Sequence, residues 1–285
     1  MRLAIHHRTS YRYARPVIFQ PHRMILRPRG SHEVVLLTSS LVCSLVAQLE
    51  WTQDVFGNLI ATGSFLEPAA ELVIASEFKV EQSAVAWPVF RITPEAHSFP
   101  FEYPPDDLAD LGALRIPEHE DPEGRMADWA RAFVRGATTD TLSLLKDLNA
   151  GILSSVAYRM RDEEGTQAPL ETLMLASGSC RDIAALFIEA VRHLGFGARA
   201  VSGYLFDAQQ KTDDPGSTHA WAEVYLPGAG WIAFDPTHRR LGGANLIPVA
   251  VARSNRQIMP IVGGYVGSPA DFLALDVAVK VTPES

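Results

Sequence analysis

Three short stretches between residues 178 and 238 constrain the fold of this 285-residue chain more than any other feature. The first, GSCRDIAALFIEAVRHLG, has the N-cap type residue Ser179 after Gly178 and carries apolar side chains at helical spacing up to the stop at Gly195. The second and third, THAWAEVYLP and GWIAFDPTH, alternate like two strands joined by a short turn at residues 227–230. This order predicts a helix followed by an antiparallel pair of strands.

Cys180 lies in the first turn of the predicted helix, and Asp182 stands where its carboxylate can reach back to the N-cap. The positive end of the helix dipole and the free N–H groups favour a thiolate, and the same N–H groups could hold an oxyanion. A buried structural cysteine is the alternative, and it suits Cys43, whose flanks alternate like a strand without a cap or a base. The cap, Gly178 and a downstream histidine and acid favour a reactive thiol at Cys180.

His219 and Asp235 can meet only if their strands pair in a suitable register. A tight four-residue connection would place the two side chains on opposite faces of the sheet. We therefore predict either a five-residue connection that pairs Tyr225 with Trp231 or a bulge near the turn. Asp235 then lies opposite Trp221 and diagonal to His219, within side-chain reach.

A cysteine, a histidine and an acid in this order are the elements of a nucleophile, its base and an orienting group. Taken singly, His219 beside aromatic residues suits a packed side chain, and Asp235 before a proline suits a turn. Their joint occurrence after a capped cysteine favours a catalytic triad. The competing interpretation is a metal site formed by Cys180, His219, Asp235 and His238. The closely spaced ligand pairs of zinc sites are missing from the sequence, so we predict no metal and no cofactor.

These blocks resemble the transglutaminase-like superfamily, whose core is a circularly rearranged relative of the papain fold. The cysteine block, the strand ARAVSGYL and the THAWAEVYLPGAGW and FDPTH blocks match in order and spacing over about residues 150–240. The opening MRLAIHHRTSYRYARPVIFQPHRMILRPRG is similar to the β-rich N-terminal region of bacterial members. The resemblance departs in VAVARSNRQIMPIVGGYVG, which retains Arg253 but lacks the further Asp of the GRDY-type stretch in those members.

Carried over residue by residue, the resemblance implies that Cys180 is the nucleophile, His219 the general base and acid, and Asp235 the group that holds the imidazole. Such a thiolate attacks a carboxamide or peptide carbonyl and leaves a thioester, which water or a primary amine resolves. The resemblance implies a transglutaminase-like acyltransferase or a cysteine peptidase or amidase acting on glutamine side chains or peptide bonds. The alternative is a non-catalytic module that binds peptides in the same cleft, because fold alone does not prove chemistry. Both imply a peptide or protein partner.

Two aromatic residues are candidates for substrate binding. Trp221 shares the predicted face of His219 and could form a wall of the cleft, although core packing is an equal alternative. Tyr204, in the strand VSGYLF, could also line the site. Asp182 is interpreted first as a helix cap.

The fold class predicted for the whole chain is α+β. Alternating segments such as NLIATGSFL and ELVIASEFKVEQSAV predict a β-sandwich-like domain over residues 1–100. A core of helices packed on an antiparallel sheet is predicted over residues 101–245, with helices around Trp129, over TLSLLKDLNAGILSSVAYRM and over LETLMLASG. The proline-rich, acidic stretch 98–124 predicts an irregular connector. Residues 246–285 form a C-terminal segment, in which apolar residues alternate from Leu273 to Val281 and predict a strand that returns to the β domain.

Composition limits the partners and the cellular compartment that we expect for this chain. The formal net charge of −8 at pH 7 gives no support for a nucleic-acid partner, which needs a basic face. The chain holds no apolar run near the roughly 18 residues of a membrane span, and its start lacks the apolar core of a signal peptide. Two cysteines in unlike contexts argue against a disulfide framework and favour a reducing compartment. We therefore predict a cytoplasmic enzyme that binds neither nucleic acid nor membrane.

Overall fold

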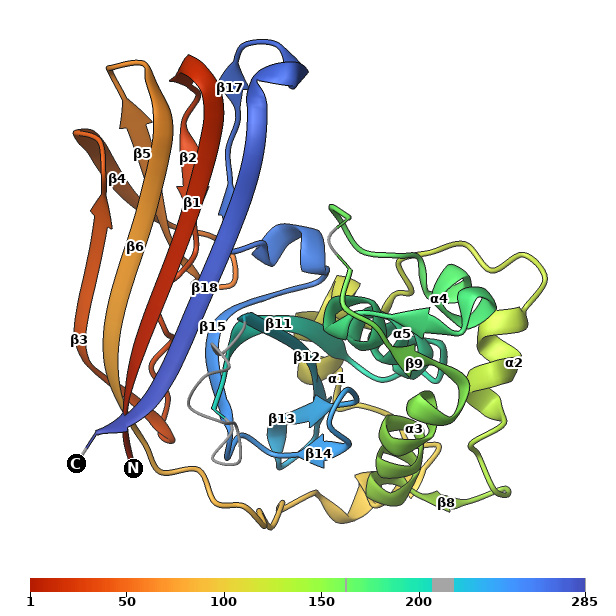
Figure 1. The fold of residues 1–285 in the computed structure, drawn as a ribbon. Coiled ribbons are helices and arrows are strands. Elements are labelled where there is room, and N and C mark those ends of the chain that lie inside the picture. Colours follow the sequence, from red (N-terminus) through yellow and green to blue (C-terminus); the bar gives the residue numbers. More distant parts are fainter. Residues whose placement is uncertain (162, 207–217, 285) are drawn as a thin grey trace.

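The computed structural model describes residues 1–161, 163–206 and 218–284. Figure 1 shows two regions side by side: a β-rich unit of long strands, and a unit in which helices lie against a second, smaller sheet. The two ends of the chain lie close together at the foot of the β-rich unit (Figure 1). This arrangement confirms the predicted α+β fold class.

Two antiparallel sheets form the β-rich unit. One has the order β17-β1-β6-β3, with β18 also paired to β1, and the other has the order β16-β2-β5-β4. The strands are β1 (Arg2–Phe19), β2 (His22–Met24), β3 (Val34–Cys43), β4 (Ala47–Gln53), β5 (Leu59–Phe65), β6 (Ala69–Gln82), β16 (Ile261–Val262), β17 (Tyr265–Val266) and β18 (Phe272–Glu284). Period-two alternation builds the interior: Leu3, Ile5 and His7 of β1 are buried, whereas His6 and Arg8 face solvent.

The C-terminal strand β18 returns to the start of the chain, as predicted. It pairs with β1 from Arg2 opposite Glu284 to Tyr13 opposite Phe272, so the two strands lie side by side in Figure 1. The alternating apolar side chains of β18 are only partly covered. Val279 is buried, but Leu275 is 50% exposed.

The second unit is organised around an antiparallel sheet of order β14-β13-β12-β11-β15. Its strands are β11 (Ala198–Leu205), β12 (Thr218–Leu226), β13 (Gly230–Asp235), β14 (Arg240–Leu241) and β15 (Leu246–Ala252). Helix α5 (Cys180–His193) packs on β11 and β12 and buries Leu186, Phe187 and Val191 completely. Because β15 pairs with β11, this sheet extends to residue 252, past the predicted division at 245. The domain boundaries themselves stay a prediction.

Three helices surround α5, and all three were predicted from sequence. They are α2 (Arg125–Arg131), α3 (Thr141–Ser155) and α4 (Pro169–Leu175), and each contacts α5. Short elements complete the chain: 3-10 helices at Pro94–Ala96, Asn255–Ile258 and Pro269–Asp271, and strands β7 (Ser98–Phe99), β8 (Thr139–Asp140), β9 (Ala157–Tyr158) and β10 (Ser177–Gly178). Within the described parts of the chain, every helix is too short or too polar to cross a bilayer.

The stretch predicted as an irregular connector contains helix α1 (Pro105–Leu111) and a 3-10 helix (Gly112–Arg115). Pro105 occupies the first turn, where the missing N–H is not needed, and Asp106 and Asp107 complement the positive end of the helix. The prolines and acids that suggested a loop are thus a helix start, and the prediction was wrong for this segment.

Candidate active site

The pairing of β12 with β13 brings His219 and Asp235 together. Tyr225 pairs with Trp231 and Leu226 with Gly230, which confirms the predicted register. In this register Asp235 is diagonal to His219, and His219 Nε2 lies 2.9 Å from Asp235 Oδ2. A one-residue slip of the strand pair would send the two side chains to opposite faces.

Cys180 is the first residue of α5, and Ser179 is its N-cap. The side chain of His219 and the backbone N–H of Ala220 on β12 lie near the sulfur, and both lower the pKa of the thiol. Because Nε2 of His219 is held by Asp235, Nδ1 is the ring nitrogen that faces the thiol. The three candidate catalytic residues are therefore ordered from sulfur to imidazole to carboxylate, and the imidazole is hydrogen-bonded to the carboxylate.

The electrostatics of these three residues favour a thiolate paired with an imidazolium. Burial alone would raise the pKa of Cys180, but the hydrogen bond and charge of His219 and the Ala220 N–H outweigh it and lower the pKa. Burial disfavours the charged form of His219 as well. The charge and hydrogen bond of Asp235, with a smaller contribution from Cys180, overcome this and raise the pKa of His219 to about 10. Although burial opposes it, contact with His219 and His238 holds the pKa of Asp235 well below its usual range.

Four hydrogen bonds hold the buried carboxylate of Asp235. His219 Nε2 and His238 Nδ1 lie 2.9 and 2.8 Å from Oδ2. The backbone N–H groups of Thr237 and His238 donate to Oδ1 over 3.1 and 3.2 Å. Sequence reasoning considered His238 only as a metal ligand and missed this contact. The Asp-Pro-Thr-His spacing, which brings a side chain back onto the acid across one turn, was the available signal.

His219, Asp235 and His238 also offer the kinds of atoms that bind zinc, and one such atom from each lies within 4.8 Å of the others. Asp235 Oδ2, however, is already the acceptor for both imidazoles. Those hydrogen bonds explain the cluster without an ion, so we interpret it as a hydrogen-bonded group.

The two aromatic candidates are not open to a substrate, because each is only 1% exposed. Trp221 stacks against His219 with ring centroids 5.9 Å apart, and it packs with Val201, Leu246 and Val251. Gly203 leaves the room this indole needs, since a side chain there would approach the Trp221 ring to 2.7 Å. Trp221 thus supports the imidazole from within the core.

Tyr204 lies at the junction with the β-rich unit. It pairs with Thr218, the residue before His219, so its side chain points to the opposite face of the sheet. Its hydroxyl donates to the Leu26 carbonyl over 3.1 Å and is hydrogen-bonded to His7 at 3.2 Å. Contact between the two units, which the local sequence does not reveal, corrects the expectation that Tyr204 contacts substrate.

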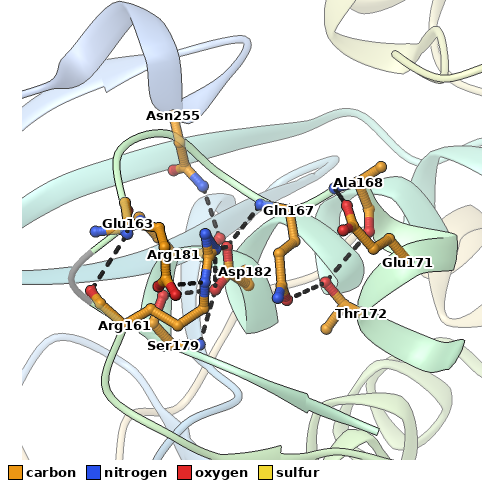
Figure 2. A network of polar contacts seen from close by, with 10 residues as sticks. All are labelled: Arg161, Glu163, Gln167, Ala168, Glu171, Thr172, Ser179, Arg181, Asp182 and Asn255. Atoms are coloured by element: carbon orange, nitrogen blue, oxygen red, sulfur yellow. Dashed lines mark hydrogen bonds and ion pairs between the residues drawn. The ribbon is translucent and has the colours of Figure 1, made fainter. Parts of the chain in front are cut away.

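Asp182 does more than cap α5. Its buried carboxylate accepts hydrogen bonds from the N–H and hydroxyl of Ser179, which is the predicted capping contact. It also accepts from the guanidinium of Arg161 at 3.1 Å and from the backbone N–H of Gln167 at 2.8 Å. Figure 2 shows these groups converging on one carboxylate from the two ends of a single loop. Asp182 therefore fastens the described parts of that loop, residues 159–161 and 163–168, to the helix turn that carries Cys180.

Further contacts in Figure 2 secure the same loop. Arg181 donates to the backbone carbonyls of Arg161 and Glu163, and Asn255 donates to the carbonyl of Arg181 over 2.7 Å. Asn255 follows β15 in the chain, so the C-terminal segment also supports the helix start. Arg253, the retained residue of the divergent segment, donates instead to the carbonyls at residues 113, 116 and 117 and joins β15 to the region after α1.

An exposed apolar edge lies beside the nucleophile. Strand β9 pairs in parallel with β10, directly before Ser179. Tyr158 at its end is 52% exposed and Met160 is 75% exposed. Tyr158 pairs with Gly178, two residues before Cys180, and burial and the charge of the Cys180 thiolate both raise its pKa. Sequence reasoning missed this edge, because Tyr158 and Met160 continue the apolar pattern of the preceding helix.

Both regions of the chain match known families. Residues 127–236 match the model of the transglutaminase-like superfamily, and residues 3–81 match that of the bacterial transglutaminase-like N-terminal region. An uncharacterized protein of Mycobacterium tuberculosis (strain ATCC 25618 / H37Rv) is 27% identical over 299 residues, covering 99% of this chain and 93% of that protein. An uncharacterized protein of Mycobacterium leprae (strain TN) is 26% identical over 304 residues, covering 99% and 98%.

A solved structure extends the likeness to the whole fold. The crystal structure of a "putative cysteine protease" from Cytophaga hutchinsonii superposes with a TM-score of 0.76 at 18% sequence identity. The superposition covers 100% of this chain and 92% of that one. The β-rich unit and the helix-covered sheet are therefore arranged alike in the two proteins.

Proposed function

This chain belongs to the transglutaminase-like superfamily, and on that premise we propose that it is a cysteine enzyme that forms a thioester on Cys180. Its substrates are glutamine side chains or peptide bonds, and its products arise by acyl transfer to an amine or by hydrolysis. The observation that carries the proposal is that His219, hydrogen-bonded to Asp235, lies beside the Cys180 thiol and lowers its pKa despite burial. A module that only binds peptides has no need of such a thiol.

In the first step the Cys180 thiolate attacks the carbonyl carbon of the amide. The carbon–sulfur bond forms, the carbon–nitrogen bond breaks, and the proton on His219 Nδ1 leaves with the amine or ammonia. His219 is then neutral and faces the thioester. In the second step it takes a proton from water or from a primary amine, which attacks the thioester and returns the sulfur as a thiolate. Asp235 stabilises the imidazolium that exists before and after the cycle.

A peptide or protein substrate is supported by the exposed edge at Tyr158 and Met160, which offers apolar contact area next to the sulfur. Tyr158 of that edge is held by the pairing of β9 with β10, and Met160 lies next to Arg161, which binds Asp182 of α5, so the edge is held in place before a substrate arrives. Both cysteines are free, and we propose a cytoplasmic location, where such thiols stay reduced.

The test is mass spectrometry of glutamine-containing peptides incubated with the full chain, with and without a primary amine. Conversion of the glutamine carboxamide to an acid indicates hydrolysis, an amine adduct indicates transfer, and backbone cleavage indicates a peptidase. Cys180→Ala should abolish each product. In the wild type, an acyl group should be trapped on Cys180 after rapid acid quench. A chain that leaves all peptides unchanged and carries no acyl group over a broad peptide library would contradict the proposal.

A further inference from the structure

Two imidazoles share one carboxylate oxygen at this site. Nε2 of His219 and Nδ1 of His238 lie 2.9 and 2.8 Å from Oδ2 of Asp235, and the two rings meet edge to face with centroids 5.1 Å apart. Their exposure differs: the side chains of Asp235 and His219 are 0% and 4% exposed, whereas that of His238 is 31% exposed. His238 is therefore the member of the group that reaches solvent.

The side chain of His238 is not needed to orient the carboxylate. The other oxygen, Oδ1, accepts hydrogen bonds from the backbone N–H groups of Thr237 and His238, which persist whatever side chain stands at 238. What the imidazole adds is a second donor on the oxygen that faces His219. A donor on Oδ2 draws negative charge from it and weakens it as an acceptor for the other imidazole.

This competition matters for the second half of the proposed reaction. After the thioester forms, His219 has to be neutral so that it can accept a proton from water or an amine. An unshared Asp235 carboxylate would favour the imidazolium more strongly and delay that step. The titratable groups beside His219 are Asp235 on β13, Cys180 on α5 and His238 itself, while Tyr158 on β9 lies near Cys180. Of these, Asp235 is the group to which His238 is hydrogen-bonded.

We propose that His238 is a positioning residue that moderates the basicity of His219 by sharing the carboxylate oxygen of Asp235. The proposal rests on the proposed function, because the moderated basicity serves thioester breakdown. It predicts that the hydrogen bond donated by Nδ1 of His238 lowers the basicity of His219. Asn places an amide N–H near that position and should replace His, whereas Leu, of the same size, should not.

The experiment compares His238→Leu and His238→Asn with the wild type. Deacylation of Cys180, followed by single-turnover quench across pH, should require a higher pH in His238→Leu and be about three- to tenfold slower at neutral pH. The pH profile of the rate at which iodoacetamide alkylates Cys180 should extend to higher pH in the same variant, because the His219 imidazolium persists there. His238→Asn should restore both profiles. His238→Gln, which is polar but sets its amide farther out, serves as a second donor-poor variant should His238→Leu fail to fold.

Identical profiles in all variants, or equal shifts in His238→Leu and His238→Asn, would overturn the role of His238. The alkylation readout keeps this result separate from the proposed function, because it needs no substrate. A wild type that forms no thioester, yet shows the shift in alkylation, would refute the proposed function and leave the coupling between His238 and His219 intact.

Discussion

The chain carries two free cysteines whose surroundings have opposite effects on the thiol. Cys43, on β3, sits among strand side chains, and burial raises its pKa. Cys180 is also only partly exposed and suffers the same opposing effect, yet its pKa is lowered. The difference is a charged partner. Burial without a partner makes a thiol inert, whereas burial beside an imidazolium stabilises the thiolate.

The comparison also refines the origin of the activation. Sequence analysis attributed it to the N-terminus of the helix. In the structure the largest favourable contribution to the thiol pKa comes from His219, and the backbone N–H that also lowers it belongs to Ala220 on β12. The first turn of α5 places the sulfur, and the neighbouring strand makes it reactive. The contact between α5 and β12 therefore adds to the effect expected of the helix start.

Exchanging each cysteine in turn gives the largest expected contrast. Cys180→Ala should reduce the rate of peptide conversion by at least about 10³-fold, since no other thiol lies at the site. Cys43→Ala should stay within about twofold of the wild type, because its side chain only packs. Product formation by mass spectrometry measures both, and thermal unfolding shows whether each variant is folded. Activity that survives in Cys180→Ala would break the distinction between the two thiols.

Removing the charged partner should make the two thiols alike. In His219→Ala the thiol loses its charged partner and keeps the Ala220 N–H against burial and the charge of Asp235, so its alkylation profile should move to higher pH, toward that of Cys43. The rate with iodoacetamide near neutral pH should fall about tenfold or more. Peptide mapping after alkylation from pH 5 to pH 10 follows both cysteines in one sample, so Cys43 is an internal control. An unchanged profile for Cys180 would mean that the helix start alone activates the sulfur.

Some of the site was predictable because it depends on rules that act over short distances. The cap Ser179 and the apolar spacing behind it mark the start of α5, and the register of β12 and β13 follows once His219 and Asp235 are required to meet. The return of β18 was visible in its alternating side chains. Each of these features is local, or is set by one geometric condition.

The remainder depends on contacts that the local pattern does not encode. Tyr204 is buried because the β-rich unit covers it, and Asp182 binds Arg161 because of the path of a loop. The contact between His238 and Asp235 could have been predicted from their spacing of three residues. We instead interpreted Asp235 as a possible turn residue and His238 as a possible metal ligand. The proline at the start of α1 led to the prediction of a loop, because proline is common both in loops and in first helical turns.

The smallest effect on thiol chemistry is expected at Asp182. This carboxylate is buried, binds Arg161 and fastens the loop that carries Met160 and follows Tyr158, but its hydrogen bonds go to the loop and the cap and not to the sulfur. Asp182→Asn loses the charge and part of the acceptor capacity. We expect the free energy of unfolding to fall by about 2–4 kcal/mol. The iodoacetamide rate of Cys180 should change by less than about twofold, while KM for a peptide rises about three- to tenfold as the loop loosens.

Arg161→Gln is the matched variant, because it removes the ion pair from the loop side and leaves the cap on Ser179 intact. It should reproduce the rise in KM with a smaller loss of stability, since Gln can still donate to the carboxylate. Denaturant unfolding, alkylation rates and peptide kinetics on the same preparations separate the three quantities. If both variants slowed alkylation as much as they raised KM, Asp182 would contribute to the reactive thiol itself. The contrast between Cys43 and Cys180 would then have to include the loop as well as the histidine.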